Sequence, residues 1–222
     1  MFRISYSLIM ALLVLLSTLT CQEQVEIGNI SKAPEIGPEE KHFANVFKPL
    51  DGVWRGEFYI YRDQRGQTQE RSQPTDLDST LFQKLPLKLE NKIRVEQTYV
   101  SKSPYFQEVR IKDMYVDESG QKQTVESYGV NKVQNGQLWC VVKKPNEKVI
   151  HRGRLEGEHT IVWQRNVCNP LRIEYFKETV KSEEYTIIGW GYYGKDDPEL
   201  SPGFWFRGRY EREGSVRNQK SK

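Results

Sequence analysis

The sequence predicts an all-β protein, an antiparallel up-and-down β-barrel of about eight to ten strands. One observation is a period-two pattern that starts at Val53, in which Trp54, Phe58 and Ile60 fall on one apolar face. Another is the set of turn signals between such runs, above all Asn135-Gly136, because both residues tolerate a positive φ in a tight hairpin. A sandwich is the alternative arrangement of this meander. We favour the barrel because closure removes exposed strand edges.

Strand patterns recur along the chain with turn residues between them. After Val53–Tyr61 they cover Lys92–Val100, Tyr105–Val116, Gln121–Val133, Gln137–Lys144, Lys148–Leu155, His159–Arg165, Leu171–Val180, Glu184–Tyr193 and Gly203–Arg212. The exception is Gln64–Lys88, where Pro74 and Pro86 interrupt the pattern. Within it, Asp76–Phe82 predicts a short helix that caps one end of the barrel.

The start of the chain differs from the middle. Residues 1–20 combine one cation, Arg3, with the apolar run Leu8–Leu16, which is typical of a secretory signal peptide. The run is shorter than the roughly 20 apolar residues that a transmembrane helix needs, and an uncleaved N-terminal anchor is the alternative. We expect a flexible tether at 21–45, the barrel at 46–212 and a disordered tail at 213–222.

Cys21 stands where a bacterial lipoprotein signal places its acylated cysteine. The preceding Thr18-Leu19-Thr20 departs from the usual pattern, so lipidation of Cys21 and ordinary cleavage nearby both stay open. Either way the protein is expected to be exported, as a secreted protein or as one anchored to the cell envelope through its N-terminus.

The composition excludes several classes of protein. A mean hydropathy of −0.71 excludes a polytopic membrane protein, and 12% aromatic residues exclude a wholly disordered chain. Lys+Arg 33 against Asp+Glu 30 is nearly balanced, and the charges alternate along the strands, so no nucleic-acid partner is expected. The three histidines have no metal-site spacing, and no Walker or G-x-S-x-G motif is present, so no metal or cofactor is predicted. The sequence does not indicate an oligomeric state.

Two cysteines fall within the predicted barrel. Cys140 and Cys168 lie on neighbouring elements, and in an exported protein such a pair is expected to form a disulfide. A catalytic thiol is the alternative, which would need a setting that lowers its pKa.

Several strand faces mix aromatic and polar residues. One face of Leu171–Val180 carries Tyr175 and Lys177, for example. Such faces indicate either a wet or ligand-filled barrel interior or polar groups that face solvent.

The segment Gly52-Val53-Trp54 resembles the G-x-W motif that opens the first strand of lipocalin-like (calycin) barrels. The resemblance implies that Trp54 packs over the closed end beneath an Arg of the last strand. Arg207 and Arg209 are the candidates for that partner, through a cation–π contact.

Two further segments, Val95–Tyr99 and Pro104–Val109, are similar to the E-Q-x-Y and P-Y-R-Q-R-V segments of the T-type phycobiliprotein chromophore lyases, the CpeT/CpcT family. Phe106 and Glu108 replace the two arginines of that pattern. The resemblance implies a calycin barrel with a cavity, and it makes a chromophore lyase one candidate function.

We therefore expect a barrel that binds a small apolar or amphipathic ligand, oriented by Gln97, Tyr99, Tyr105 and Glu108. Side-chain alternation lets at most one of Tyr105 and Glu108 point inward. The alternative is a lyase that attaches a linear tetrapyrrole to a protein cysteine, with Glu96 or Glu108 as proton donor. A further alternative is a structural envelope protein without catalysis.

Overall fold

The computed structural model describes Ile30 and residues 32–69, 73–74 and 77–214. The chain in this part forms ten strands, two short 3-10 helices and one α-helix. The strands are β1 Gly52–Asp63, β2 Leu87–Ser103, β3 Phe106–Val116, β4 Lys122–Gln134, β5 Gln137–Lys143, β6 Lys148–Leu155, β7 Thr160–Cys168, β8 Leu171–Lys181, β9 Glu184–Tyr193 and β10 Phe204–Arg212. The helices are η2 Pro38–Phe43, η3 Lys48–Leu50 and α2 Ser79–Lys84.

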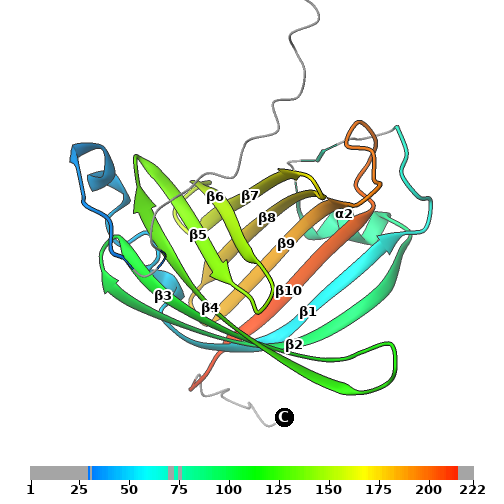
Figure 1. Ribbon diagram of the computed structural model, residues 1–222, viewed down its shortest axis with the longest axis horizontal. Coiled ribbons are helices and arrows are strands. Elements are labelled where there is room, and N and C mark those ends of the chain that lie inside the picture. The colour runs from blue at the N-terminus through cyan, green and yellow to red at the C-terminus, as the bar shows by residue number, and fades with distance from the viewer. Residues whose placement is uncertain (1–29, 31, 70–72, 75–76, 215–222) are drawn as a thin grey trace, which may run out of the picture.

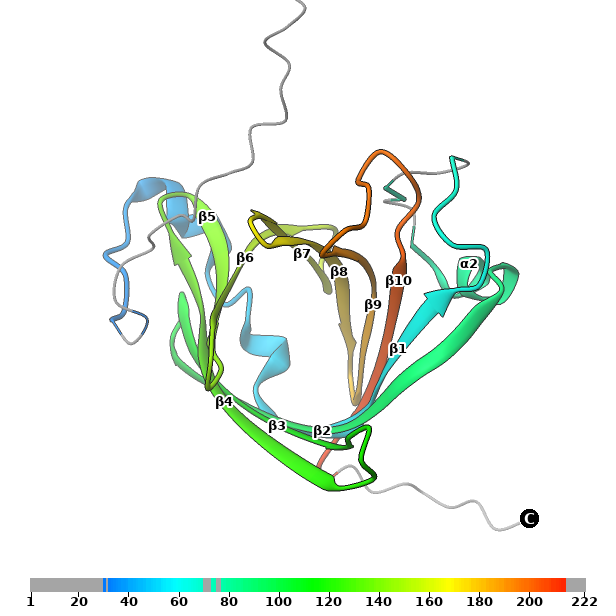
Figure 2. The same ribbon diagram turned by 45° about the vertical axis from the view of Figure 1, so that its right-hand side comes forward.

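The strands form one closed barrel in which each strand pairs antiparallel with its sequence neighbours and β1 also pairs with β10 (Figures 1 and 2). The predicted all-β, up-and-down barrel is therefore confirmed, with ten strands. The expected Asn135-Gly136 hairpin is present between β4 and β5, and both residues have positive φ, 53° and 65°. Short hairpins of this kind keep sequence neighbours side by side, so the barrel closes only where β10 meets β1.

One end of the barrel is plugged by η3 and the start of β1. Trp54 is fully buried, its Nε1 donates to the Leu50 carbonyl at 2.6 Å, and its ring meets Tyr185 edge-on with centroids 5.6 Å apart. The guanidinium of Arg212 lies 4.3 Å from the centroid of the Trp54 ring. The expected cation–π contact thus exists, but Arg212 makes it.

The prediction that Arg207 or Arg209 covers Trp54 is wrong, because alternation along β10 turns both side chains to the outside, where both are exposed. Arg209 forms an ion pair with Glu184 at 3.0 Å on that outer surface.

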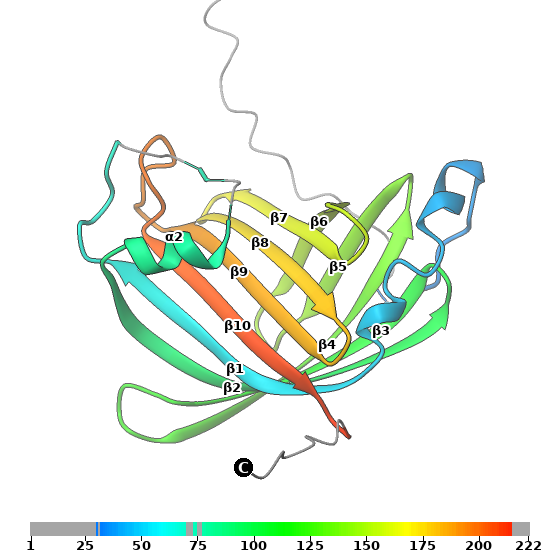
Figure 3. The same ribbon diagram turned by 180° about the vertical axis from the view of Figure 1, so that it is seen from behind.

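The helix in the interrupted segment lies at 79–84, close to the predicted 76–82, and Asp78 caps it by accepting from the backbone of Thr80 and Leu81. It packs on the outside of the barrel wall, as Figure 3 shows, and does not cap an end. Phe82 meets Trp205 edge-on at 5.9 Å between centroids. Part of the outward surface of β8 to β10 therefore carries a second apolar cluster.

Part of the predicted tether lies against the barrel. Glu40 of η2 is buried, and its carboxylate accepts from the backbone of Gly136 at 3.0 Å, in the β4–β5 hairpin. The predicted signal peptide at 1–20 and Cys21 lie outside the described residues, as does the predicted tail beyond Gly214. No helix within the described part of the chain is long and apolar enough to span a membrane.

Candidate functional site

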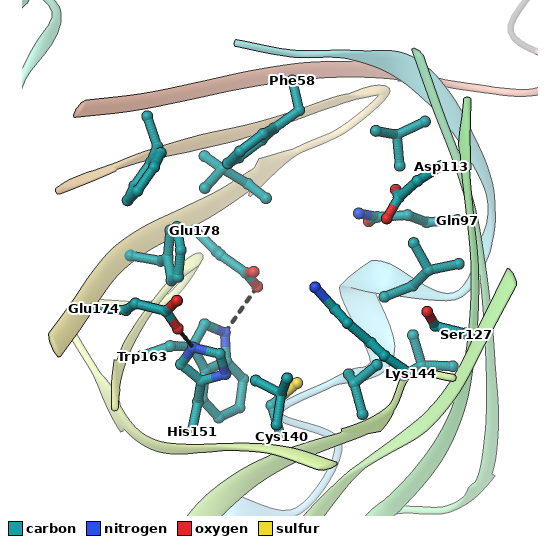
Figure 4. Close-up of a pocket in the computed structure, with 18 of the residues that line it drawn as sticks. Phe58, Gln97, Asp113, Ser127, Cys140, Lys144, His151, Trp163, Glu174 and Glu178 are labelled. Carbon is teal, nitrogen blue, oxygen red and sulfur yellow. Dashed lines mark hydrogen bonds and ion pairs between the residues drawn. The ribbon is translucent and has the colours of Figure 1, made fainter. Parts of the chain in front are cut away.

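The barrel interior holds a partly open cavity of about 320 Å³ to which every strand contributes lining residues (Figure 4). At about 30 Å³ per molecule this volume corresponds to about ten waters, and it lies at the lower end of the range for small-molecule pockets. Aromatic side chains form much of the wall, including Phe58, Trp163, Phe176 and Phe206. The interior is therefore hollow and partly polar.

Two of the four predicted ligand-binding residues line this cavity. Gln97 and Tyr99 both point inward from β2, and the Tyr99 hydroxyl donates to Gln97 Oε1 at 2.7 Å. Tyr105 precedes β3 and packs against a cluster at the plugged end that contains Phe47. Glu108 is on the outward face of β3 and pairs with Lys102 at 3.4 Å, so its predicted place in the site is wrong.

The cavity wall also holds Glu178, which sequence reasoning did not select. Its carboxylate points into the hollow from β8 (Figure 4) and accepts from Trp163 Nε1 at 2.8 Å. Burial raises the pKa of Glu178 to about 7, against the hydrogen bonds from Trp163 and Tyr185, which favour the charged form. Glu178 therefore changes its charge near neutral pH.

Glu174, four residues earlier on β8, has a pKa that is lowered, whereas that of Glu178 is raised. Burial disfavours its charge, but hydrogen bonds from His151 at 3.0 Å and Tyr193 at 2.7 Å, with the charge of Arg165, hold its pKa at about 2. Because a carboxylate only accepts, Nε2 of His151 carries the proton in this contact. Two carboxyl groups on one strand thus have pKa values pushed in opposite directions by their surroundings.

A hydrogen-bond network at the plugged end fixes the orientation of Asn131. The side-chain Nε2 of Gln107 donates to the Phe47 carbonyl at 2.8 Å and to Asp51 Oδ1 at 2.9 Å. The amide oxygen of Gln107 therefore receives Asn131 Nδ2 at 2.9 Å. Asn131 Oδ1 is left without a partner, and so is Ser127 Oγ, although both atoms are buried and both residues line the cavity.

Cys140 is a free thiol in the cavity wall, so the predicted Cys140–Cys168 disulfide is wrong. Strand β6 lies between β5, which carries Cys140, and β7, which ends at Cys168. Two strand spacings amount to about 9–10 Å, beyond the Cα–Cα reach of a disulfide. Burial raises the pKa of the Cys140 thiol, so the site does not provide the low-pKa setting of a catalytic cysteine.

Within the described residues no group of three or more His, Cys, Asp or Glu side chains could hold a metal ion. The cavity instead offers aromatic contact, two hydrogen-bonding atoms without partners and one carboxyl group that titrates near pH 7. This combination of side chains is typical of a binding site for a small molecule with an apolar body and a polar group.

Comparison with family models and with curated proteins found no match. Among solved structures, the chain is similar to Rv2717c from M. tuberculosis, with TM-score 0.44 and 10% identity over 81% of this chain and 99% of that one. It is also similar to a redesigned β-barrel, mFAP0, bound to DFHBI, with TM-score 0.35 and 12% identity over 74% and 99%. The fold assignment itself rests on the strand pairing.

Proposed function

We propose that the interior of this barrel binds a small amphipathic ligand. The observation that carries the proposal is the pair of buried atoms without partners, Asn131 Oδ1 and Ser127 Oγ, in the wall of a 320 Å³ hollow. A buried polar atom without a hydrogen bond costs about 1–3 kcal/mol, so native proteins rarely keep one unless water or a ligand satisfies it. A bound molecule with polar groups supplies the missing bonds.

The aromatic wall supplies the affinity in this proposal. Burying the apolar part of a ligand against Phe58, Phe176 and Phe206 is worth roughly 25 cal/mol per Å² of apolar surface removed from water. The Tyr99–Gln97 pair lies in the same wall and gives a fixed polar surface, so these two residues orient the ligand. We also propose that the protein acts outside the cytoplasm, because the N-terminal sequence has the pattern of an export signal.

The ligand proposal is tested with the neutral fluorescent probe N-phenyl-1-naphthylamine and the variant Ser127→Ala. Because Ser127 Oγ has no partner in the protein, its removal leaves the fold intact and takes away one bond to the bound molecule. We expect the probe to bind the full chain, and molecules co-purified from the native host to be held less tightly by Ser127→Ala. Thr124→Ala is the matched control, since Thr124 is exposed on the same strand.

Native mass spectrometry of protein from its own host provides the second measurement. A protein without a bound molecule, without probe fluorescence and with only ordered water in its interior would overturn the proposal. That outcome would favour the structural envelope protein, which needs only its outer surface.

A chromophore lyase of the CpeT/CpcT type is the second candidate, supported by the sequence resemblance at 95–109. Its expected proton donors lie outside the cavity: Glu96 pairs with Arg55 at 2.7 Å, and Glu108 pairs with Lys102. In this alternative the interior carboxyl group, Glu178, takes their place. Co-expression with bilin-producing enzymes and an acceptor protein tests it, because a lyase leaves a covalently attached pigment on the acceptor and a binding protein does not.

A further inference from the structure

Two of the four carboxyl groups that line the cavity form ion pairs with arginines. Glu174 lies 3.6 Å from Arg165, and Glu147 accepts from Arg172 and, at 3.5 Å, from Arg165. Burial raises the pKa of Asp113, and the charge of Lys144, which reaches into the hollow from the segment after β5 (Figure 4), partly opposes that shift. Glu178 remains, and among the described residues no cationic side chain forms an ion pair with it.

The groups that face Glu178 from the other strands are neutral. Trp163 of β7 donates a hydrogen bond to the Glu178 carboxylate. In addition to burial, the charge of Glu178 raises the pKa of four titratable groups on other strands, Tyr99 of β2, Cys140 of β5, Tyr185 of β9 and Tyr210 of β10. Burial raises the pKa of each of these four, which keeps them uncharged around pH 7. On its own strand, Glu174 is anionic and is occupied by His151, Tyr193 and Arg165.

One of the two cavity atoms without a partner also favours a donor on the ligand. Asn131 Oδ1 can only accept a hydrogen bond, and the Glu178 carboxylate can only accept when it is ionised. Trp163, Phe58 and Phe176 line the same cavity, and the ring faces of aromatic side chains attract cations. The hollow thus offers acceptors, aromatic side chains and, at Glu178, a carboxylate without an ion pair among the described residues.

We propose that the ligand of this cavity carries a positively charged nitrogen, which donates to Glu178 and supplies the counter-charge that the protein does not provide. The inference rests on the proposed ligand-binding function and narrows it to amines with an aromatic or aliphatic body. The nitrogen reaches Glu178 beside Trp163, and the apolar body fills the aromatic part of the hollow.

The proposal requires affinity to depend on pH in a defined direction. The amine pairs with ionised Glu178, so binding releases the proton that the carboxyl group holds in the free protein. With a pKa of about 7, the ionised fraction rises from about one tenth at pH 6 to about nine tenths at pH 8. The affinity for an amine that stays charged over this range should rise about tenfold.

The experiment is isothermal titration calorimetry of the full chain with three probes that share an indole ring: tryptamine, tryptophol and indole-3-acetate. We expect tryptamine to bind most tightly, with about tenfold higher affinity at pH 8 than at pH 6, while the affinity for tryptophol stays flat. Titrations at pH 7 in buffers of different ionisation enthalpy should show release of about half a proton with tryptamine. Glu178→Gln should weaken tryptamine binding on the order of thirtyfold and leave tryptophol binding nearly unchanged.

Glu184→Gln is the matched control, because Glu184 lies on the outer surface of β9 and pairs there with Arg209. Equal binding of tryptamine and tryptophol, or tightest binding of indole-3-acetate, would overturn the cationic ligand and leave the binding function standing. The same holds if Glu178→Gln binds tryptamine as well as the wild type does. If none of the three probes and no neutral probe binds, both proposals are wrong.

Discussion

Replacing Glu178 by Gln should stabilise the free protein, and by an amount that depends on pH. The ordinary pKa of a glutamate is 4.5, and burial raises that of Glu178 to about 7 in the folded state. Below pH 4.5 the carboxyl group is protonated in both states and does not reduce stability. Between pH 4.5 and 7 the unfolded chain loses this proton while the folded state keeps it, so stability falls with pH and levels off above 7. The gap between the two pKa values corresponds to about 3 kcal/mol of lost stability.

Glutamine has nearly the same shape as glutamate and no charge, so the unfolding free energy of the variant does not fall with pH at this site. The difference in unfolding free energy between Glu178→Gln and the wild type should therefore rise in favour of the variant by about 3 kcal/mol from pH 4 to pH 8. The assay is urea denaturation at intervals of one pH unit, with Glu184→Gln as control. Any constant effect of the substitution cancels in the pH dependence. A difference that stays flat from pH 4 to pH 8 would refute the electrostatic reasoning.

Further predictions concern other parts of the chain. Glu174→Gln should have the opposite effect, because Glu174 has a folded pKa of about 2 and stabilises the protein above pH 4.5 by about 3 kcal/mol. In urea denaturation the variant should lose this unfolding free energy completely at pH 7, and the loss should shrink as the pH falls through 4.5 towards 2. Trp54→Phe removes the donor to the buried Leu50 carbonyl and should lower the unfolding free energy by about 1–3 kcal/mol, measured by the same method; no loss would contradict the role of this bond. Cys140 should react slowly with iodoacetamide in the native protein and faster after unfolding, because burial raises the pKa of its thiol; rapid native labelling found by peptide mapping would contradict that raised pKa. Mass spectrometry of the mature protein should find an N-terminus that begins at an acylated Cys21 if the lipoprotein signal is used, and a terminus elsewhere without acyl chains rejects lipidation.

The strands were predictable because their signals are local. Period-two alternation marks each strand, and Asn135-Gly136 at positive φ marks a hairpin, so the ten-strand meander follows from short stretches of sequence. Which residue of the last strand covers Trp54 depends on how distant strands pair and not on a local sequence pattern. The register of β10 against β1 places Arg212 opposite Trp54, and nothing in the spacing of Arg207, Arg209 and Arg212 specifies that register.

The interior of β8 shows why half of the site was missed. Alternation divides this strand into two faces. The face with Tyr175 and Lys177 mixes aromatic and polar residues, which is the composition expected of a pocket wall, so it is the face that the sequence favours. In the structure Tyr175 stacks on Trp190 in the outer cluster, with ring centroids 5.2 Å apart, and the opposite face of the strand lines the cavity. Where an apolar cluster covers the outward face of β8, the opposite face of the strand can turn carboxyl groups inward, against the usual rule that polar faces meet solvent.

The position of Glu178 links stability to function. An ionised carboxylate in the hollow lowers the stability of the free protein at pH 8 by about 3 kcal/mol, and a positively charged ligand nitrogen offsets that loss only while it is bound. The amine should therefore raise the melting temperature more at pH 8 than at pH 6 when it is present at the same excess over the total protein. A neutral ligand of the same shape has no charge to offset the loss, so its effect on the melting temperature should not increase with pH in this way. This difference between two ligands is the thermal counterpart of the proton released on binding, and it uses only the wild-type chain.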